Sequence, residues 1–235
     1  MKLTKRQESI LLGTILGDGY LQKTGVKNAR LKLEHGDAQK EYLIWKGKQF
    51  PKLFLGKPVY LERVHPKTNH VYKYWRWQSN STPVFGDWHR SFYKNGKKYL
   101  PTDLIKLLSQ PLSLAVWYMD DGYFHHLNHN RHSMIYLGRI SLKEAKIAEE
   151  AIARNFNIQP RVYDKKKKGY ALFFPVVETK KLHDLIRPHM LSIFNYKLYS
   201  LWPRNDLPVF CGQSIRFKRI LTRHLPMLNR DEDIV

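Results

Sequence analysis

An apolar run that ends in two acids constrains the fold of this chain more than any other stretch. Residues 111–124 read PLSLAVWYMDDGYF, in which Pro111 suits the first turn of a helix and Ser113 can cap it. The run ends at Asp120 and Asp121. Negative charge is unfavourable at a helix C-terminus, and acids are costly to bury unless a cation meets them. The stretch therefore favours a functional carboxylate over a solvated acidic turn closed by a glycine.

A second copy of this pattern lies near the N-terminus. Residues 11–21 read LLGTILGDGYL, which is again an apolar helix followed by an acid, a glycine and an aromatic residue. Aligning Asp18 with Asp121 places the two copies about one hundred residues apart, the spacing of a duplicated domain. The repeat predicts two halves that each supply one carboxylate to a shared site.

Charge and composition narrow the class of protein. The chain has 235 residues, enough for two domains of about 100 residues each. Its 41 Lys and Arg against 20 Asp and Glu give a net charge of +21, which implies a polyanionic partner, with nucleic acid ahead of an anionic membrane. No apolar run approaches the roughly 20 residues that span a bilayer, so we expect no membrane partner.

The cysteine and histidine content argues against disulfides and zinc. Cys211 is the only cysteine, so the chain can form no internal disulfide, and a reducing compartment fits. We interpret this residue as a small buried or half-buried side chain. The spacing of the 11 histidines matches no compact zinc ligand set, and we exclude zinc.

Hydrophobic periodicity predicts the same order of elements in both halves. Thr4 can cap a first helix in which Gly13 and Gly17 lie on one side and allow another backbone to approach closely. Val116 and Asp120 stand at the matching positions of the second copy, so close packing is less strongly indicated on that side.

The remaining elements alternate between hairpins and helices. In the first half we expect hairpins at 19–35 and 59–79, helices at 37–54, 84–92 and 104–108, and a lysine-rich loop at 94–98. In the second half we expect hairpins at 122–140 and 159–174, and helices at 141–156, 178–186 and 190–198. Ser141 and Glu144 form a capping box at the start of the helix at 141–156. This pattern predicts an α+β (α/β) fold with antiparallel hairpins.

Two segments carry a resemblance to a known family. LLGTILGDG (residues 11–19) and LAVWYMDDG (residues 114–122) resemble the LAGLIDADG signature of homing endonucleases, and the single-chain, two-motif, intron-encoded members are the most similar. The resemblance implies two pseudo-symmetric half-domains, each α-β-β-α-β-β-α. It also implies that the antiparallel sheets form a curved DNA-binding saddle and that the two motif helices meet at the interface of the halves. We expect an N-terminal half-domain with linker at 1–108, a C-terminal half-domain at 109–200, and a basic, unassigned extension at 201–235.

If the motif helices lie side by side, Asp18 and Asp121 end close together and can bind hard divalent ions such as Mg²⁺. Two metal ions can activate water and stabilise the leaving oxygen of a phosphodiester. The resemblance implies that the last acid of each motif supplies a side-chain ligand, and that the preceding residue, Gly17 or Asp120, supplies a backbone carbonyl. We therefore expect Mg²⁺, with Mn²⁺ able to substitute, and we interpret the Asp120 side chain as structural.

Two lysines are candidates for balancing charge on the transition-state phosphate. Lys98 and Lys197 follow the acid of their own half at similar distances of about 80 residues, where related enzymes carry an active-site lysine. Lys97 is the neighbouring alternative, and a merely solvated lysine is the competing interpretation in so basic a chain.

The hairpins supply candidate DNA-binding side chains, because a two-stranded ribbon fits the major groove, where Arg and Lys read guanine and Asn and Gln read adenine. In the first half these are Gln22, Lys23, Lys27, Arg30, Lys32, Arg63, Lys67, Lys73, Arg76 and Gln78. In the second half they are His126, Asn128, His129, Arg131, Arg139, Arg161, Lys165, Lys166, Lys167 and Lys168. We expect most of them to contact phosphate. A solvated hairpin tip is the alternative for residues 165–168.

Together these features predict a monomeric, site-specific homing endonuclease that makes a double-strand break in a long asymmetric DNA target by Mg²⁺-dependent phosphodiester hydrolysis. The alternatives are an intron RNA maturase that uses the same fold, and a DNA-binding regulator derived from it. The regulator is disfavoured because both motif acids are intact. We expect an intracellular protein, in a mitochondrion or chloroplast or in a prokaryotic cytoplasm.

Overall fold

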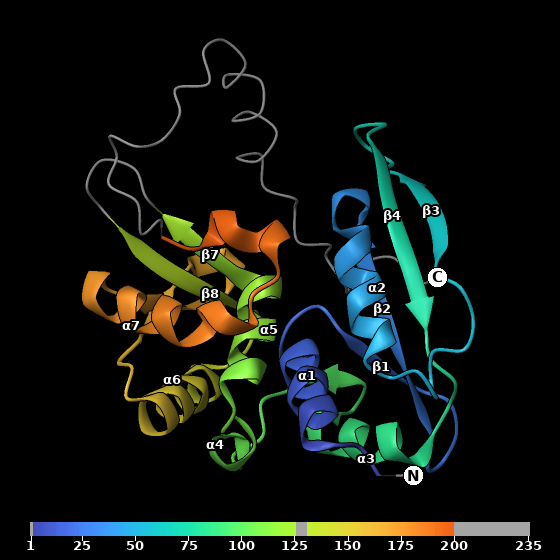
Figure 1. Cartoon of the computed structure of the whole chain (residues 1–235), viewed down its shortest axis with the longest axis horizontal. Coiled ribbons are helices and arrows are strands. Elements are labelled where there is room, and N and C mark those ends of the chain that lie inside the picture. Colours follow the sequence, from blue (N-terminus) through green and yellow to red (C-terminus); the bar gives the residue numbers. More distant parts are fainter. Residues whose placement is uncertain (1, 126–130, 200–235) are drawn as a thin grey trace. The chain divides into compact units, whose positions relative to one another are not determined.

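A computed structural model describes residues 2–125 and 131–199, which form one compact unit (Figure 1). The predicted extension at 201–235 and the candidate residues His126, Asn128 and His129 lie outside the described residues. In the part of the chain that is described, no helix combines the length and the apolar character needed to cross a membrane.

The first half follows the predicted order. Its elements are α1 (Lys5–Leu16), β1 (Tyr20–Lys23), β2 (Ala29–Gly36), η1 (Asp37–Gln39), α2 (Lys40–Lys48), β3 (Val59–Val64), β4 (Val71–Gln78), α3 (Pro83–Phe92), β5 (Tyr93–Lys94), β6 (Lys97–Lys98) and α4 (Leu104–Leu107). The four long strands form an antiparallel sheet in the order β1-β2-β4-β3. Helices α2 and α3 pack on one face of this sheet.

The second half repeats the plan. Its elements are α5 (Pro111–Asp121), β7 (Gly122–His125), β8 (His132–Gly138), α6 (Leu142–Phe156), β9 (Arg161–Asp164), η2 (Lys166–Lys168), β10 (Tyr170–Phe174), α7 (Val176–Ile186), η3 (Arg187–His189) and η4 (Ser192–Lys197). The sheet order, β7-β8-β10-β9, is the equivalent of the first. Helices α6 and α7 pack on one face of it. The predicted α+β fold of two equivalent antiparallel halves is confirmed.

Local sequence signals explain where the elements begin. Capping boxes open α1, where Thr4 pairs with Gln7, and α6, where Ser141 pairs with Glu144. The helix expected at 37–54 is shorter, because its first three residues form the 3₁₀ turn η1 and α2 ends at Lys48. The segment expected as a lysine-rich loop is instead the β5–β6 hairpin.

Helices α1 and α5 pack closely against each other, as the two glycines predict (Figure 1). A Cβ atom added at Gly13 would lie 2.4 Å from the Ser113 carbonyl oxygen and 2.7 Å from Val116 Cβ. A Cβ atom at Gly17 would lie 2.5 Å from Asp120 Cβ. The glycines of α1 thus make room for the larger side chains of α5, so the packing is close although the second copy lacks the small residues.

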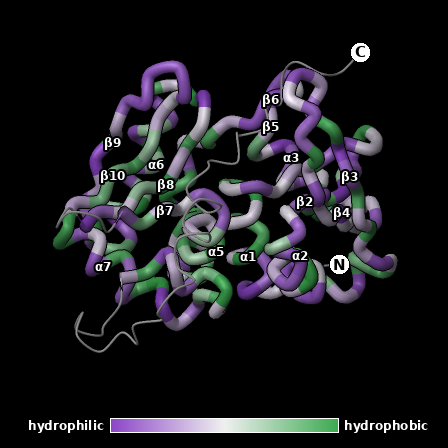
Figure 2. Tube along the Cα trace, turned by 90° about the horizontal axis from the view of Figure 1, so that it is seen from above, coloured by the Kyte–Doolittle hydropathy of each residue, from purple (hydrophilic) through white to green (hydrophobic). Residues whose placement is uncertain are grey.

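Buried apolar residues from both halves join in one core cluster that includes Leu11 and Ile15 of α1 and Leu114 and Trp117 of α5. In Figure 2 hydrophobic segments gather around α1 and α5, and the outer strands are more hydrophilic. The core does not separate at residue 108, and the predicted boundary between half-domains stays a prediction.

Candidate active site

The first motif acid, Asp18, is exposed just beyond the end of α1, where a lysine binds the last carbonyls of the helix. Lys98 Nζ donates to the Ile15 carbonyl oxygen at 2.7 Å and to the Gly17 carbonyl oxygen at 2.8 Å. The β5–β6 hairpin holds Lys98 at this position. Its turn has positive φ at Asn95 (52°) and Gly96 (74°), the Asn-Gly pair that favours a two-residue hairpin turn.

The second half has the equivalent arrangement at the end of α5. Lys197 Nζ donates to the Met119 carbonyl oxygen at 2.6 Å and to the Asp120 carbonyl oxygen at 3.3 Å. Burial lowers the pKa of Lys197, while the nearby acids, with Asp120 foremost, act to raise it. A cation at a helix C-terminus is stabilised by the helix dipole. The structure therefore brings both predicted lysines to the motif helices, one at each C-terminus.

The second motif acid, Asp121, is the last residue of α5 and is half-buried. Burial raises the pKa of Asp121 well above its ordinary value, and the charges of Asp18 and then Asp120 raise it further. Lys98 and Lys197 oppose this shift but do not cancel it. The two motif acids therefore lie near enough to interact.

Sequence reasoning did not identify the cation that meets Asp120. Lys46 Nζ, from α2 of the other half, lies 2.7 and 2.8 Å from the two carboxylate oxygens of Asp120. The side chains of Lys46 and Asp120 are 1% and 0% exposed. The backbone N–H of Asp18 also donates to Asp120 Oδ2, at 3.2 Å. The Asp120 side chain thus joins the end of α1, the end of α5 and α2, which is the structural role expected of it.

A neutral histidine completes this buried group. Lys46 Nζ lies 3.3 Å from His35 Nε2, and His35 Nδ1 lies 3.2 Å from Gln39 Oε1. Because an ammonium group can only donate, Nε2 accepts, and the ring proton resides on Nδ1 and is donated to Gln39. Burial and the charge of Lys46 lower the pKa of His35 to about 3, which is consistent with a neutral ring.

Lys46 leaves a signal in the sequence, although a weak one. It lies three and four residues after Leu43 and Tyr42, so it shares the buried face of α2 with them. Its ammonium group lies 4.3 Å from the centroid of the Tyr42 ring. A lysine on the apolar face of a short helix needs a buried partner, and the acids of the motif could supply it.

Several groups near the ends of the motif helices offer ligand atoms for a cation. Ligand atoms of Asp18, His35 and Asp120 lie within 4.8 Å of one another. Lys46 contacts both oxygens of Asp120 as well as His35 Nε2, which leaves the carboxylates of Asp18 and Asp121 as the side-chain donors. Burial, and after it the charge of Asp18, raises the pKa of Asp121, and such a pair of carboxylates fits a divalent cation with oxygen ligands.

The predicted carbonyl ligands have other partners in this structure. The Gly17 carbonyl oxygen accepts from Lys98, and the Asp120 carbonyl oxygen accepts from Lys197. A carbonyl oxygen has two lone pairs, so each keeps one for a further donor or ligand. Their role as metal ligands stays a prediction.

Candidate DNA-binding residues of the first half lie mainly on one face of its sheet. Leu31, Leu33 and Trp77 are buried against the helices, so the alternate residues of β1, β2, β3 and β4 face away from them. On this open face lie Gln22, Arg30, Lys32, Arg63, Arg76 and Gln78. Lys73 lies on the opposite face, 4.0 Å from Glu62.

The other described candidates lie at strand ends and in turns. Those that are exposed are Lys23, Lys27, Lys67, Arg131, Arg139, Arg161, Lys166, Lys167 and Lys168. Lys165 is half-buried between the rings of Tyr136 and Tyr163, 5.4 and 5.7 Å from their centroids. These placements leave the contacts with nucleic acid as predictions.

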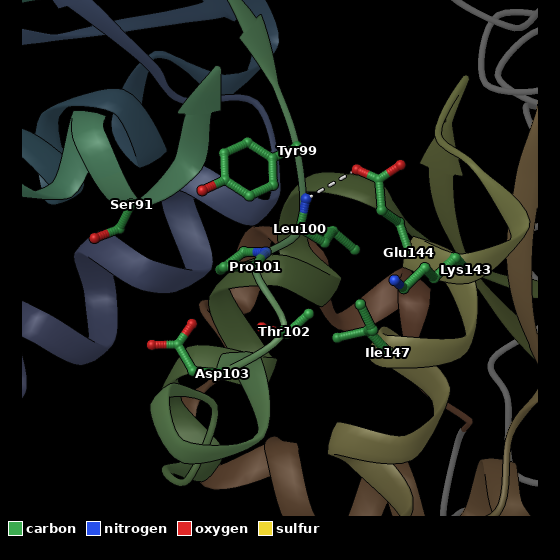
Figure 3. Close-up of a pocket in the computed structure, with 9 residues that line it drawn as sticks. All are labelled: Ser91, Tyr99, Leu100, Pro101, Thr102, Asp103, Lys143, Glu144 and Ile147. Atoms are coloured by element: carbon green, nitrogen blue, oxygen red, sulfur yellow. Dashed lines mark hydrogen bonds between the residues drawn. The ribbon is translucent and has the colours of Figure 1, made fainter.

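A separate cavity of about 550 Å³ lies between residues 99–103 and α6 (Figure 3). Its wall includes Tyr99, Pro101 and Ile147, and the Leu100 backbone N–H donates to Glu144 Oε1 at 3.0 Å across one side. No candidate site residue lines it. The cavity is therefore distinct from the motif acids.

Comparisons with known proteins agree with this architecture. The model of the LAGLIDADG DNA endonuclease family matches residues 8–182. The chain is 29% identical over 226 residues to protein RecA of Mycolicibacterium flavescens, covering 91% of this chain but 49% of that protein, so it spans about half the length of this relative. It is 27% identical over 199 residues to the probable intron-encoded endonuclease 1 of Wickerhamomyces canadensis, covering 83% of this chain and 85% of that protein.

One solved structure has the same fold over most of both chains. The homing endonuclease I-WcaI, solved bound to its DNA recognition sequence, aligns with a TM-score of 0.78 and 26% identity, over 85% of this chain and 88% of that one. The family match covers both motifs and the sheets between and after them. The chain therefore belongs to the LAGLIDADG DNA endonuclease family.

Proposed function

We propose that this protein is a site-specific homing endonuclease that makes a double-strand break in a long, asymmetric DNA target. One observation carries the proposal: each motif helix ends at an acid, Asp18 or Asp121, and each has a lysine bound to its last carbonyls. Two corresponding centres, one at the end of each motif helix, suit the two strands of one duplex. The similarity to I-WcaI, which was solved on its DNA recognition sequence, supports a duplex substrate.

We assign Asp18 and Asp121 as the side-chain ligands of Mg²⁺, with Mn²⁺ able to replace it. The ion, when bound, supplies an activated water and stabilises the leaving oxygen of the phosphodiester. Asp18 and Asp121 provide the carboxylate oxygens that hold the ion in place. Asp121 starts from a raised pKa, so ion binding requires loss of its proton, and affinity for the ion rises with pH over the range where Asp121 titrates.

Lys98 and Lys197 have two roles in this proposal. Their hydrogen bonds hold the C-terminal carbonyls of α1 and α5, which orients the acids that follow. Their positive charges stabilise negative charge that develops on the phosphate in the transition state. Gly17 and Asp120 offer the remaining lone pair of each carbonyl to the same centre.

The substrate partner is double-stranded DNA bound by a monomer. Basic and amide side chains on the open face of the first sheet can reach base edges, while exposed lysines and arginines in the turns contact phosphate. A genomic DNA target implies a protein inside the cell, in an organelle or in a prokaryotic cytoplasm.

The test is cleavage of a randomised double-stranded DNA library by the full chain with Mg²⁺ and, separately, with EDTA. We expect discrete double-strand cuts that require the metal. Asp18→Asn and Asp121→Asn should each leave one strand uncut, and the two variants should spare opposite strands. Asp103→Asn, which changes an exposed acid at the start of α4, is the matched control and should cut as the parent does.

Absence of cleavage in every condition would refute the nuclease assignment. Tight binding of intron RNA by the same preparation, unaffected by Asp18→Asn or Asp121→Asn, would instead favour the maturase alternative. Specific duplex binding without cleavage would favour the regulator.

A further inference from the structure

The open face of the second sheet has a different chemistry from that of the first. Ser133 and Phe124 point toward α7, since Ser133 Oγ lies 2.8 Å from His183 Nε2 and the Phe124 ring lies 5.0 Å from the His183 ring. The alternate residues of the same strands therefore point away from the helices. They include six ring side chains, which we call the aromatic face: Tyr123, His125, His132, Tyr136, Tyr163 and Phe173.

Five of these rings form a nearly continuous row. His125 stacks on His132 with ring centroids 4.9 Å apart, and His132 lies 5.0 Å from Phe173. Phe173 in turn lies 6.5 Å from Tyr163, and Tyr123 lies 6.4 Å from His125. Tyr123 and Tyr163 are 45% and 50% exposed, so part of the row is open to a ligand.

Charge separates the two sheets. The open face of the first sheet carries Arg30, Lys32, Glu34 and Arg76, with Arg76 Nε 2.6 Å from Glu34 Oε1. Among the described strand residues on the open face of the second sheet, Arg161 alone carries a full charge. Arginine reads guanine through hydrogen bonds, whereas apolar side chains recognise the C5-methyl group of thymine.

The aromatic face begins directly at the motif acid. Asp121 is followed by β7, so Tyr123 lies two residues beyond the carboxylate. Basic residues flank the rings, with Arg131 before β8, Arg139 after it and Lys165 after β9. Duplex DNA with a phosphate at Asp121 can thus lie along the rings while its backbone contacts these cations.

We propose that the aromatic face reads the half-site on the Asp121 side through thymine methyl groups, so that this half-site is rich in A·T pairs and the half-site on the first sheet depends more on guanine contacts. The inference rests on the proposed function for its duplex substrate. It assigns a base preference to a surface on which, among the described strand residues, only Arg161 carries a full charge.

The test measures binding, so it does not depend on cleavage. A randomised duplex library is selected on the full chain in Ca²⁺, and the enriched site is then rebuilt with deoxyuridine, which lacks the methyl group, in place of thymidine in one half-site at a time. We expect affinity to fall by about 4-fold for each contacted methyl group, from the free energy of burying one carbon group. Phe173→Ala and Tyr163→Ala should relax base preference in the sensitive half, and Arg76→Ala in the other half.

The deoxyuridine comparison changes only the DNA, so it holds even if a ring variant folds poorly. Equal sensitivity of the two half-sites, or none in either, would overturn the inference, as would failure to select any duplex. Tighter binding of single-stranded than of double-stranded oligonucleotides, lost in Phe173→Ala, would overturn it in favour of a platform for unstacked bases. Cleavage assays on the selected site then test the nuclease assignment separately.

Discussion

Replacing Lys46 by Met removes the buried cation that holds Asp120 and leaves an uncompensated carboxylate between α1 and α5. Both side chains are almost fully buried and the two N–O distances are 2.7 and 2.8 Å, so this is a complete ion pair rather than a surface contact. Breaking a buried pair by removing one partner costs about 3–5 kcal/mol. For a chain of this size, that corresponds to a fall in melting temperature of roughly 6 to 20 °C.

The double variant Lys46→Met with Asp120→Asn separates the ion pair from the rest of the packing. The new side-chain amide would keep a carbonyl oxygen for the Asp18 backbone N–H, and no charge would remain buried. Replacing both members of a buried ion pair by well-packed hydrophobic residues of similar volume often leaves the free energy of unfolding unchanged, and the double variant likewise removes both buried charges. We therefore expect the double variant to be no less stable than Lys46→Met alone. The coupling free energy is then at least the cost of Asp120→Asn alone, which is about 3–5 kcal/mol because that single change leaves Lys46 buried without its partner.

Urea unfolding followed by tryptophan fluorescence measures each free energy, and Lys48→Met provides the control. Lys48 lies on the same helix but is exposed, so its replacement should change stability by less than about 0.5 kcal/mol. If Lys46→Met behaved like Lys48→Met, or if the two single effects simply added, the ion pair would not have the role deduced from its geometry.

Three further changes test other parts of the structure by thermal unfolding. Gly13→Ala should cost about 1–3 kcal/mol, because the new Cβ would meet the backbone of α5; an unchanged melting temperature would contradict the close helix contact. Burial lowers the pKa of His183 to about 3, so stability should fall as pH drops below 6.5, and His183→Gln should flatten that slope. The raised pKa of Asp121 has the opposite sign: the metal-free protein should lose stability as pH rises above 3.8, an effect absent in Asp121→Asn and offset by Mg²⁺ in the parent. If the melting temperature of His183→Gln or of Asp121→Asn changed with pH in the same way as that of the parent, the shifted pKa of that residue would be contradicted.

The sequence predicted most of the fold because its signals are local. Two copies of a motif predicted two corresponding halves, capping boxes predicted the starts of α1 and α6, and alternating residues predicted the hairpins. The lysines near each acid could also be located, since Lys98 and Lys197 keep similar spacings from Asp18 and Asp121. The structure places both at the ends of the motif helices.

The features that the sequence did not predict have three different physical causes. Periodicity places Lys46 on the buried face of α2, but Lys46 and Asp120 are far apart along the chain and nothing in the sequence identifies Asp120 as its partner. The β5–β6 hairpin was missed for a different reason: Asn95-Gly96 is a strong turn signal, but strands of two residues give no alternation. The rings of the aromatic face have ordinary strand positions in the sequence, and only the register places them on one surface.

The contacts around Asp120 also bear on whether the two halves are interchangeable. Asp120 corresponds to Gly17 of the first motif, and its carboxylate occupies the space that a side chain at position 17 would need. One half therefore supplies the acid, and the other supplies the glycine, the backbone N–H and the lysine that receive it. This arrangement can form only once, because Gly17 has no side chain with which to repeat it. The two halves therefore differ in structure around the motif acids.

The two motif acids consequently lie in unequal environments. The backbone N–H of Asp18 donates to the Asp120 carboxylate, whereas Gly17 has no side chain that could offer Asp121 the equivalent bond. We therefore expect the two strands of a target to be cut at different rates, so that a duplex nicked in one particular strand accumulates early in a cleavage time course. Nicks distributed equally between the strands would show that this asymmetry does not reach the chemistry.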